Sequence, residues 1–494
     1  MNRSPDVVII GSGMGGATLA ASLAPTGAEI VILERGEQIP DDAPARDPDR
    51  IYKNSAFRSG ETWLDGQGKR FSPGNYYNVG GNSKFYGAVL LRYRRQDFQA
   101  MEHEGGISPA WPFSYETLAP YYTVAENLYR VRGDVTSDAT EPAHDGPYPF
   151  PPVPDEPAIA AVRKRLEKAG VHPFTLPLGV DIDTWLSHGA DGWDGYPDIR
   201  SGKMDAETCG LSAALSHDNV TLVTGARVTG LETEPDGRRI ASVTYHRNGE
   251  TMMLAPRFVA LAAGAVQSAA LLLKSGLANS SDQVGRNFMN HNASALIAYD
   301  PRFVNDSIYQ KTFGINDWYL SDGHNGPPLG NVQLLGRVVP KILKANVPSL
   351  PMAACRHVSR HAVDLYAISE DLPDPESRVV VSGDDIQLIW RRSNMAAHHK
   401  LVAQTKKTLK AAGFPVVLSR LFDGRVPSHQ CGTARIGSDP KTAVLDPDCR
   451  SFDHENLFVT DASALPTSAA VNPALTVAAL AMKAADAMRK ELGA

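Results

Sequence analysis

The chain has 494 residues, of which 43% are hydrophobic and 21% are charged, with a formal net charge of −6. This length predicts two or more domains or one large composite domain, and the mildly acidic balance argues against a nucleic-acid-binding surface, which would be basic. The four cysteines lack CxxC spacing, which predicts neither a disulfide framework nor a zinc site.

No stretch of the sequence has the features of a secretory leader or a membrane-spanning helix. The N-terminus leads almost directly into an apolar strand, and no run of about 18 apolar residues occurs. The composition therefore predicts a cytoplasmic enzyme with reduced cysteines and no membrane span.

The first segment follows the order strand, glycine-rich turn, helix, strand and acid. Residues 6–10 (DVVII) form an apolar run typical of a buried parallel strand, and residues 11–16 (GSGMGG) follow at once. Residues 17–23 have a helical pattern, and a second strand at residues 29–33 ends in Glu34. This order predicts a dinucleotide-binding unit, whereas a GxGxxG sequence alone would be weak evidence.

Each glycine of this turn has its own expected role. Gly11 permits the tight turn, Gly13 lets a pyrophosphate approach the helix N-terminus, and Gly16 lets the helix pack closely on the strand. The Glu34 carboxylate can accept hydrogen bonds from an adenosine ribose. The pattern does not separate FAD from NAD, but a 2′-phosphate would meet the Glu34 charge, which argues against NADP.

A second glycine-rich stretch lies at residues 78–88 (NVGGNSKFYGA). The adjacent Gly80 and Gly81 permit positive φ and a close approach of the backbone to a flat ligand. Taken alone, such a pair is more often an ordinary turn, so its interpretation depends on the other motifs.

Several motifs in a fixed order resemble the glucose–methanol–choline (GMC) family of FAD-dependent oxidoreductases, and the resemblance covers nearly the whole chain. Within the family, the chain resembles bacterial members that oxidise sugars and glycosides. The motifs are GSGMGG and NVGGNSKFYGA, then WPFSYETLAPYY at 111–122, SAALSHDNVTLVTGARV at 212–228, FVALAAGAVQSAALLLKSG at 258–276, DQVGRNFMNH at 282–291, HQCGT at 429–433 and LFVTDASALPTSAAVNPALT at 457–476.

By this resemblance the cofactor is FAD. The positions that match its binding residues are Gly11, Gly13, Gly16 and Glu34 for the ADP half, Gly80, Gly81, Asn82 and Ser83 for the flavin and pyrophosphate, Val228 for the adenine, Gly264 and Ala265 near the ADP moiety, and Asp461 and Ala462 for a late FAD-contacting turn. Some members attach FAD through a histidine in the second glycine stretch, where this chain has Phe85. The resemblance therefore implies FAD that is bound non-covalently.

Two polar residues near the C-terminus match the catalytic positions of the family. His429 precedes a turn of small residues, and Asn472 precedes Pro473 at the predicted start of an apolar helix over residues 474–488. Each residue alone would more often be structural. By the resemblance, His429 takes the hydroxyl proton of the substrate while flavin N5 receives the hydride, and Asn472 holds the substrate oxygen. Pro473 suits a first helical position, and the helix dipole behind it would face the flavin, which places Pro473 with the cofactor.

The resemblance implies an α/β fold in two parts. One is a Rossmann-like FAD-binding domain, and the other is a discontinuous domain built on an antiparallel sheet plus helices, as in the GMC and p-hydroxybenzoate-hydroxylase-like architecture. We expect the FAD-binding domain to comprise residues 1–95, 200–295 and 426–494, and the substrate-binding domain to comprise residues 96–199 and 296–425.

The rest of the sequence predicts further elements. Residues 111–131 and 157–169 have helical patterns, and residues 134–154 form a loop rich in Pro, Asp and Thr. If the strands of the C-terminal half share one sheet, alternate side chains face the flavin. His398 and His399 are expected on a helix surface, and no metal site is expected. The predicted strands are 219–224 and 239–247, assigned to one β-meander, and 331–336, 362–369, 378–382 and 385–390.

Polar-tipped and aromatic side chains of this half are candidates for the wall of the substrate pocket. Large sheets also need aromatic residues in their cores, so each candidate has a purely structural alternative. The candidates are Tyr309, Gln310, Asn316, Trp318, Gln333 and Trp390.

The sequence thus predicts an FAD-dependent oxidoreductase acting on a CH–OH group, with a sugar, glycoside or polyol as the preferred substrate class. Oxidation of an aryl or aliphatic alcohol is an alternative, as is a dehydrogenase that passes electrons to a separate acceptor protein or quinone. A non-catalytic flavoprotein is a third alternative, which the paired His429 and Asn472 disfavour. Whether O2 or another acceptor reoxidises the flavin is not encoded in any motif.

Overall fold

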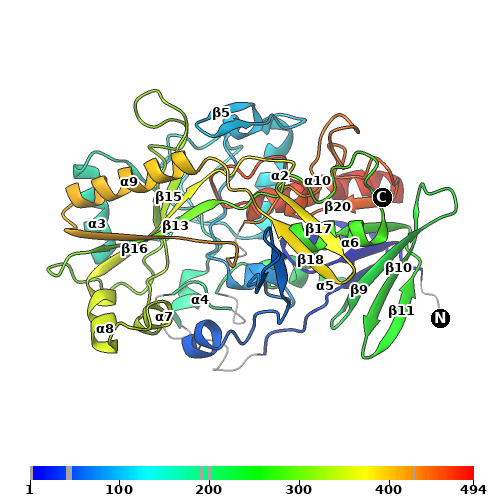
Figure 1. Cartoon of the computed structure of the whole chain (residues 1–494), viewed down its shortest axis with the longest axis horizontal. Helices are drawn as coiled ribbons and strands as arrows, with labels where there is room; N and C mark the ends of the chain where they lie inside the picture. Colours follow the sequence, from blue (N-terminus) through cyan, green and yellow to red (C-terminus); the bar gives the residue numbers. More distant parts are fainter. Residues whose placement is uncertain (1–3, 41–46, 188–192, 198–201, 427–428, 494) are drawn as a thin grey trace.

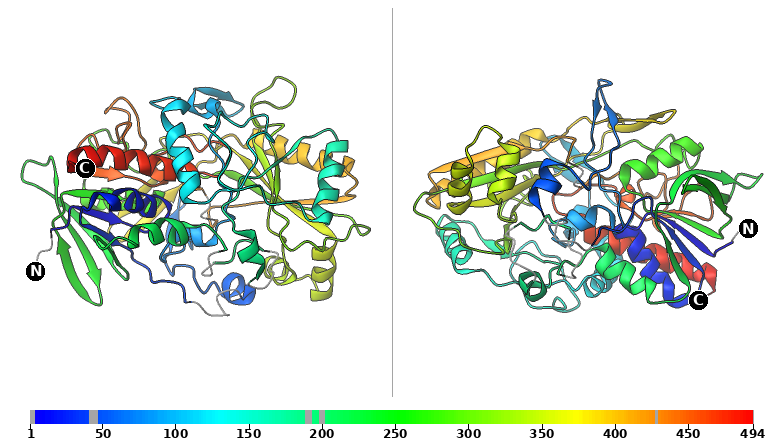
Figure 2. Two further views of the ribbon diagram at one scale, coloured as in Figure 1. Left: turned by 180° about the vertical axis from the view of Figure 1, so that it is seen from behind. Right: turned by 90° about the horizontal axis from the view of Figure 1, so that it is seen from below.

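The computed structural model describes residues 4–40, 47–187, 193–197, 202–426 and 429–493. In this part of the chain the largest sheets are a five-stranded parallel sheet and a six-stranded antiparallel sheet. They lie toward opposite ends of the long axis of the molecule, with both termini at the end of the parallel sheet (Figure 1 and Figure 2). This arrangement confirms the predicted α/β class with a Rossmann-like unit and a second unit on an antiparallel sheet.

The parallel sheet has the strand order β20-β12-β1-β2-β8. Except for the edge strand β8, its strands are short apolar runs with every residue buried, as is typical of parallel strands covered on both faces. Helix α1 joins β1 to β2, α6 follows β12, and α10 packs against α1. The bounds are β1 (Val7–Ile10), α1 (Met14–Leu23), β2 (Ile30–Leu33), α5 (Ser212–Leu215), β8 (Val220–Val223), β12 (Phe258–Leu261), α6 (Ala265–Ser275), β20 (Leu457–Val459) and α10 (Ala474–Leu492).

A three-stranded antiparallel meander flanks α6 beside this sheet. It has the order β11-β10-β9, with β9 (Arg227–Thr233), β10 (Ile240–Arg247) and β11 (Glu250–Leu254). The strand predicted at residues 219–224 is β8, which pairs in parallel with β2, so its assignment to the meander is wrong. An alternating sequence predicts a strand but carries no information about the strand it pairs with.

The antiparallel sheet has the order β19-β13-β16-β15-β14-β7. One face packs on α3 and α9 through a hydrophobic cluster that includes Val332, Leu334 and Leu365. Because successive side chains of a strand alternate, Gln333 and Tyr366 lie on the opposite face. The bounds are α3 (Pro157–Lys168), β7 (Pro173–Thr175), β13 (Asn292–Tyr299), β14 (Phe313–Ile315), β15 (Asn331–Leu334), α7 (Pro340–Asn346), α8 (Met352–Arg360), β16 (Ala362–Ser369), α9 (Met395–Ala411) and β19 (Val416–Leu421).

The strands predicted at residues 378–382 and 385–390 form a hairpin in a different sheet. They are β17 (Arg378–Ser382) and β18 (Asp385–Ile389), and β18 pairs in parallel with β3 (Trp63–Asp65), which pairs with β4 (Arg70–Phe71). Of the four strands predicted in this half, β15 and β16 therefore share the antiparallel sheet, whereas β17 and β18 belong to another. Their partners come from the N-terminal part of the chain, which the local pattern could not reveal.

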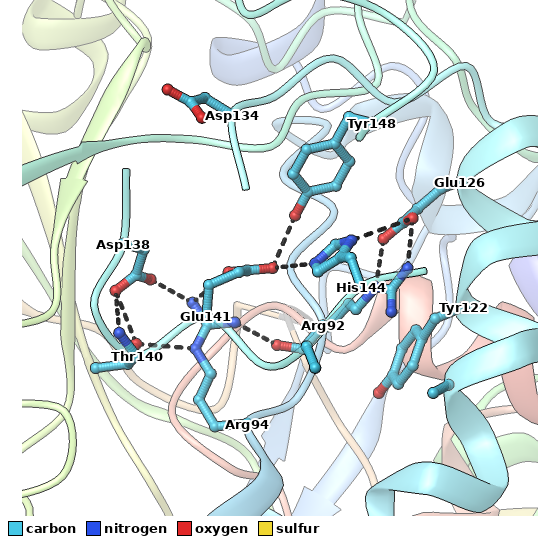
Figure 3. Close-up of polar contacts among 12 residues, drawn as sticks. Arg92, Arg94, Tyr122, Glu126, Asp134, Asp138, Thr140, Glu141, His144 and Tyr148 are labelled. Carbon is cyan, nitrogen blue, oxygen red and sulfur yellow. Dashed lines mark hydrogen bonds and ion pairs between the residues drawn. The ribbon is translucent and has the colours of Figure 1, made fainter. Parts of the chain in front are cut away.

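The predicted loop over residues 134–154 contains no helix or strand, yet buried ion pairs fix it in place. Arg92 contacts Glu126 of α2 (Tyr115–Leu128), and Arg94 contacts Asp138 and Glu141 of the loop (Figure 3). The other short elements are β5 (Met101–His103), β6 (Gly106–Ser108) and α4 (Ile182–Ser187).

Two helical details differ from the sequence prediction. Helix α10 begins at Ala474, so Pro473 is its N-cap residue and not its first helical residue. His398 is fully buried, and its ring nitrogens form hydrogen bonds with the Ser294 and Ser369 hydroxyls. Its neighbour His399 is exposed. The expectation of a surface histidine pair is wrong for His398, because α9 turns that position toward β13 and β16. Among the helices described, none is both long enough and apolar enough to cross a membrane.

Candidate active site

Three glycines of the first turn are explained by close packing of the backbone. A Cβ on Gly11 (φ +106°) would lie 2.4 Å from the Ala262 oxygen, and one on Gly16 would lie 2.0 Å from the Gly11 oxygen. A Cβ on Gly15, which sequence reasoning did not single out, would lie 1.8 Å from the Thr460 oxygen. The start of α1 is therefore pressed against the ends of β12 and β20.

Gly13 has a different explanation. Its φ is −71°, which any residue adopts, and a Cβ there would meet no protein atom within 4 Å. No side chain caps α1 at this residue. The second glycine stretch faces the same place, since a Cβ on Gly81 would lie 3.4 Å from Gly13 Cα. Open space before an uncapped helix N-terminus suits the pyrophosphate of a dinucleotide.

Glu34 directly follows β2, as predicted, and its carboxylate is bound by Ser12. Its Oε2 accepts hydrogen bonds from the Ser12 N–H at 3.0 Å and the Ser12 hydroxyl at 2.6 Å, and Oε1 accepts from the Gly36 N–H at 2.9 Å. Burial raises the pKa of this carboxyl, although these hydrogen bonds oppose the shift. Because each carboxylate oxygen has two acceptor positions, one remains at Oε1 for a ribose hydroxyl.

Ser12 also connects the two glycine stretches, a role that sequence reasoning missed. Its hydroxyl accepts from the Gly80 N–H at 3.1 Å. In the following turn the Ser83 hydroxyl donates to the Gly80 oxygen at 2.6 Å, whereas Asn82 is exposed and accepts from the Tyr76 N–H at 3.1 Å. The hydrogen bond from Gly80 to Ser12 therefore holds the second glycine stretch against the first.

Asp461 ties the ends of β12 and β20 together. Its Oδ2 accepts from the Gly264 N–H at 2.8 Å and the Ser268 hydroxyl at 2.5 Å, and its Oδ1 accepts from Ser463 just beyond Ala462. Gly264 (φ +89°) precedes Ala265, the first residue of α6, and a Cβ on it would meet no protein atom within 4 Å. These residues line the same edge of the parallel sheet as the first glycine turn.

Val228 lies on β9, where it pairs with Tyr245 of β10. Since β9 is at the edge of the meander, the other side of its backbone has no strand partner among the described residues. The open cradle at Gly13, the remaining acceptor of Glu34 and this strand edge together fit the ADP half of FAD. Phe85, at the position of the flavin-linking histidine, instead stacks on Tyr76 at 3.7 Å.

The two predicted catalytic residues meet although they are far apart in the chain. Asn472 Nδ2 lies 3.3 Å from His429 Nε2. His429 has a φ of +69°, a left-handed conformation that costs a non-glycine residue about 1–3 kcal/mol and is often found at functional sites. Asn472 precedes the N-cap of α10. The start of this helix therefore positions Asn472, and a loop positions His429.

A second histidine, which sequence reasoning did not assign, contacts the first. His291 Nδ1 lies 2.7 Å from His429 Nδ1, and His291 Nε2 lies 2.8 Å from the Ser468 oxygen. Burial lowers the pKa of His291 to about 4. Burial, His291 and Lys311 together hold the pKa of His429 well below its usual value, so both rings are neutral near pH 7.

Beside this pair lies the face of the antiparallel sheet that is turned away from α3 and α9. The Tyr366 ring is centred 6.5 Å from the His429 ring, and Gln333 is the register partner of Tyr366 on β15. Gln333 is 1% exposed and its Oε1 has no hydrogen-bond partner among the described residues. Lys311 precedes β14 and pairs with Asp194 at 2.9 Å.

The other pocket candidates take part in hydrogen bonds or packing contacts of their own. Gln310 donates to the Leu335 oxygen at 2.9 Å and accepts from Asn305 at 2.8 Å, and Trp318 belongs to the cluster beneath α3 and α9. Asn316 Nδ2 donates a hydrogen bond to Asp138 Oδ2 at 2.6 Å, and Tyr309 is buried against Trp185. Trp390 follows β18 and donates to Asp371 at 2.8 Å.

The residues that sequence reasoning missed share one property. Ser12, Gly15, His291 and Tyr366 act through contacts with segments remote in the chain. Of these, His291 is the one that the sequence could have indicated, because Asn290 and His291 form a polar pair directly before the strand at residues 292–299.

Family models and known proteins are similar to this chain over most of its length. Two family models, both described as GMC oxidoreductase, match residues 6–293 and 373–481. The 6'''-hydroxyparomomycin C oxidase of Streptomyces lividus is 28% identical, over 100% of this chain and 93% of the relative. The fructose dehydrogenase large subunit of Gluconobacter japonicus is 25% identical, over 99% of this chain and 98% of the relative. The solved structure of pyridoxine 4-oxidase from Mesorbium loti has a TM-score of 0.68 at 20% identity, over 99% of both chains.

Proposed function

The chain belongs to the GMC oxidoreductase family, whose members are FAD enzymes, and we propose that it oxidises a CH–OH group of a sugar, glycoside or polyol. The main observation behind this proposal is the contact between His429 and Asn472, which places a neutral base next to an amide. Oxidation of an alcohol needs both, because a hydroxyl proton must leave while the oxygen is held.

The preference for a polyhydroxylated substrate rests on two unpaired acceptors, one on Asn472, which contacts the base, and one on Gln333, the strand partner of Tyr366. Gln333 Oε1 and Asn472 Oδ1 are both buried and have no hydrogen-bond partner among the described residues. A substrate with several hydroxyl groups offers donors to such oxygens, and a buried acceptor left unpaired costs about 1–3 kcal/mol. Two relatives are named for fructose and for 6'''-hydroxyparomomycin C.

In the proposed mechanism the protein moves and holds the proton. FAD, when bound, supplies the two-electron acceptor for the hydride of the carbinol carbon. His429 takes the hydroxyl proton at Nε2, and the lowered pKa keeps that nitrogen unprotonated near pH 7. Asn472 donates from Nδ2 to the substrate oxygen and does not compete for the proton. The N-terminus of α10 has no side-chain cap, and its dipole stabilises an anion by about 0.3–2 kcal/mol.

Several finer points belong to the same proposal. FAD is held non-covalently, because Phe85 offers no atom for a bond to the flavin. Residues 1–95, 200–295 and 426–494 hold the cofactor, and residues 96–199 and 296–425 recognise the substrate. The enzyme works in the cytoplasm, which suits its free cysteines. Its electrons pass to O2 or to another acceptor.

Oxidation of an aryl or aliphatic alcohol is the second candidate, and one observation favours it. Tyr366 and Ile368 form an apolar cluster with Ala293, Leu335 and Phe422 on the sheet face beside His429. An apolar ring would bury against this cluster and leave Gln333 unpaired.

The test is the visible spectrum of the purified protein under anaerobic conditions. We expect flavin bands that bleach with one sugar, glycoside or polyol and do not bleach with matched aryl and aliphatic alcohols. Bleaching by simple alcohols alone would overturn the substrate class. Protein that stays folded but retains no FAD would overturn the proposal as a whole. Admitting air to the bleached sample then shows whether O2 is the acceptor.

A further inference from the structure

The contact between the two histidines contains information about where their protons lie. Nδ1 of His291 and Nδ1 of His429 are 2.7 Å apart, which is a hydrogen-bond distance between two nitrogens. One of these nitrogens must carry a proton and the other must be bare. A neutral imidazole has one N–H and one acceptor nitrogen, so the choice for one ring fixes the other.

The Ser468 carbonyl makes this choice. Its oxygen lies 2.8 Å from His291 Nε2 and 2.9 Å from the Tyr93 hydroxyl. A carbonyl oxygen only accepts, so His291 Nε2 carries the proton of that ring and its Nδ1 is bare. His429 Nδ1 must then donate to His291 Nδ1, which leaves His429 Nε2 bare. Asn472 Nδ2, a donor, faces that nitrogen at 3.3 Å, as this proton order requires.

We propose that His291 is a positioning residue that fixes the tautomer of His429, so that the unprotonated Nε2 points to the substrate hydroxyl. This inference rests on the proposed function insofar as it takes His429 as the base. The opposite tautomer would place bare Nε2 of His291 against the Ser468 oxygen and direct an N–H of His429 at the Asn472 amide group.

The charged groups around the pair act on it in different directions. Lys311, paired with Asp194, lowers the pKa of His429, and Glu370 raises the pKa of His291. Tyr366 is a further titratable ring next to His429, and burial raises its pKa well above the working range. Once protonated at low pH, His291 lowers the pKa of His429 by charge repulsion, so replacing it alters the acid side of the pH profile of the base.

Two variants of His291 separate its two nitrogens. Asparagine places an amide oxygen near the position of Nδ1, so His291→Asn keeps the acceptor for His429. Glutamine places an amide nitrogen near the position of Nε2, so His291→Gln keeps the contact with Ser468 and loses that acceptor. We expect reduction of the bound flavin in His291→Asn to stay within about tenfold of the wild type. His291→Gln should be slower than His291→Asn by about tenfold or more, because a wrong tautomer of a catalytic histidine costs up to about 10⁴ in serine proteases.

Two further readouts distinguish a positioning role from a structural one. In His291→Asn the acid limb of kcat/KM should move to higher pH, since the lowering effect of His291 on the pKa of His429 is gone. In the wild-type holoenzyme, nitrogen NMR of labelled histidine should show His429 protonated at Nδ1 and His291 at Nε2. Signals are assigned with His429→Asn and His291→Asn.

The NMR result decides the inference even where a variant does not fold. Protonation of His429 at Nε2 in the wild type would overturn it, as would equal flavin reduction in the Asn and Gln variants. Failure of the proposed function gives a different pattern, because the tautomers stay as expected while no alcohol bleaches the flavin.

Discussion

Two buried groups of polar side chains in this protein differ in how completely their atoms are paired. In the first, which Figure 3 shows, Arg92 lies 2.6 Å from Glu126 and Arg94 lies 2.6 Å from Asp138. Glu141 contacts Arg94, His144 and Tyr148, so several partners surround each charge. We call this group the ionic network.

The second group, the histidine pair of His291 and His429, contains no full charge near pH 7. Its hydrogen bonds run in one direction from Asn472 to the Ser468 oxygen, and they leave Asn472 Oδ1 without a partner among the described residues. The comparison teaches that a group which fixes a loop pairs its charges fully, whereas a group which transfers a proton keeps an acceptor available.

The pKa shifts follow the same division. Burial raises the pKa of Glu141, but Arg94 and His144 outweigh burial and leave that pKa below its usual value. Burial lowers the pKa of His291 to about 4, with no carboxylate close enough to reverse the shift. Glu141 of the ionic network thus keeps its charge on folding, whereas burial favours the neutral form of both histidines of the pair.

The largest effect on the rate of flavin reduction, and the strongest test of this comparison, is expected from a change at His429. We expect His429→Asn to slow flavin reduction by about 10²–10⁴-fold, which is the usual contribution of a general base. Asparagine tolerates the left-handed backbone of this position, so the unfolding temperature should change little. Stopped-flow absorbance of the flavin measures the rate.

The matched control is His398→Asn, which alters a buried histidine whose ring nitrogens bond to Ser294 and Ser369. It should lower stability and leave the reduction rate close to that of the wild type. A His429→Asn enzyme within tenfold of the wild type would remove His429 from the base role, and with it the catalytic half of the comparison.

The next effect belongs to the ionic network and concerns stability. Glu126→Ala should lower the free energy of unfolding by about 3–5 kcal/mol, because it leaves the buried Arg92 guanidinium without its carboxylate. Urea titration of the holoenzyme measures the change. Flavin reduction, per folded molecule, should stay near the wild-type rate.

Helix α2 offers a matched control for this variant. Glu116 contacts Arg95 at 2.6 Å, but both side chains are about half exposed. Glu116→Ala should give no measurable change, because water and salt screen such a pair. Equal losses from the two variants would show that burial does not set the strength of the network.

The sequence predicts one member of the histidine pair, His429, together with its neighbour Asn472, and no member of the ionic network, for a physical reason. His429 and Asn472 were predicted because they match catalytic positions of the GMC family in the family's motif order, and the structure places them 3.3 Å apart. Arg92 and Arg94 carry no such signal, since charged residues are ordinarily expected on the surface. Their burial depends on α2 and on the loop over residues 134–154, which come together only in the folded chain.

The same limit applies to the fold. The pattern of strand, glycine turn and helix predicts β1, α1 and β2, because the period of apolar residues is local. It does not predict that β8 joins β2, nor that Gly15 is needed against the Thr460 oxygen. Contacts of this kind join segments hundreds of residues apart, and no local pattern records them.

The smallest expected effect tests whether the two groups communicate. Tyr93 lies between Arg92 and Arg94, and its hydroxyl donates to the Ser468 oxygen that also binds His291. Tyr93→Phe should lower the free energy of unfolding by about 0.5–1.5 kcal/mol and slow flavin reduction by less than about tenfold.

Tyr129→Phe is the control, because Tyr129 is equally buried and its hydroxyl lies 2.7 Å from the Thr18 hydroxyl, far from Ser468 in the chain. It should cost similar stability and leave the rate unchanged. If Tyr93→Phe slows reduction and Tyr129→Phe does not, the ionic network positions the carbonyl that orders the histidine protons. If neither variant changes the rate, His291 alone is enough to hold that order, and the two groups share a neighbour without sharing a function.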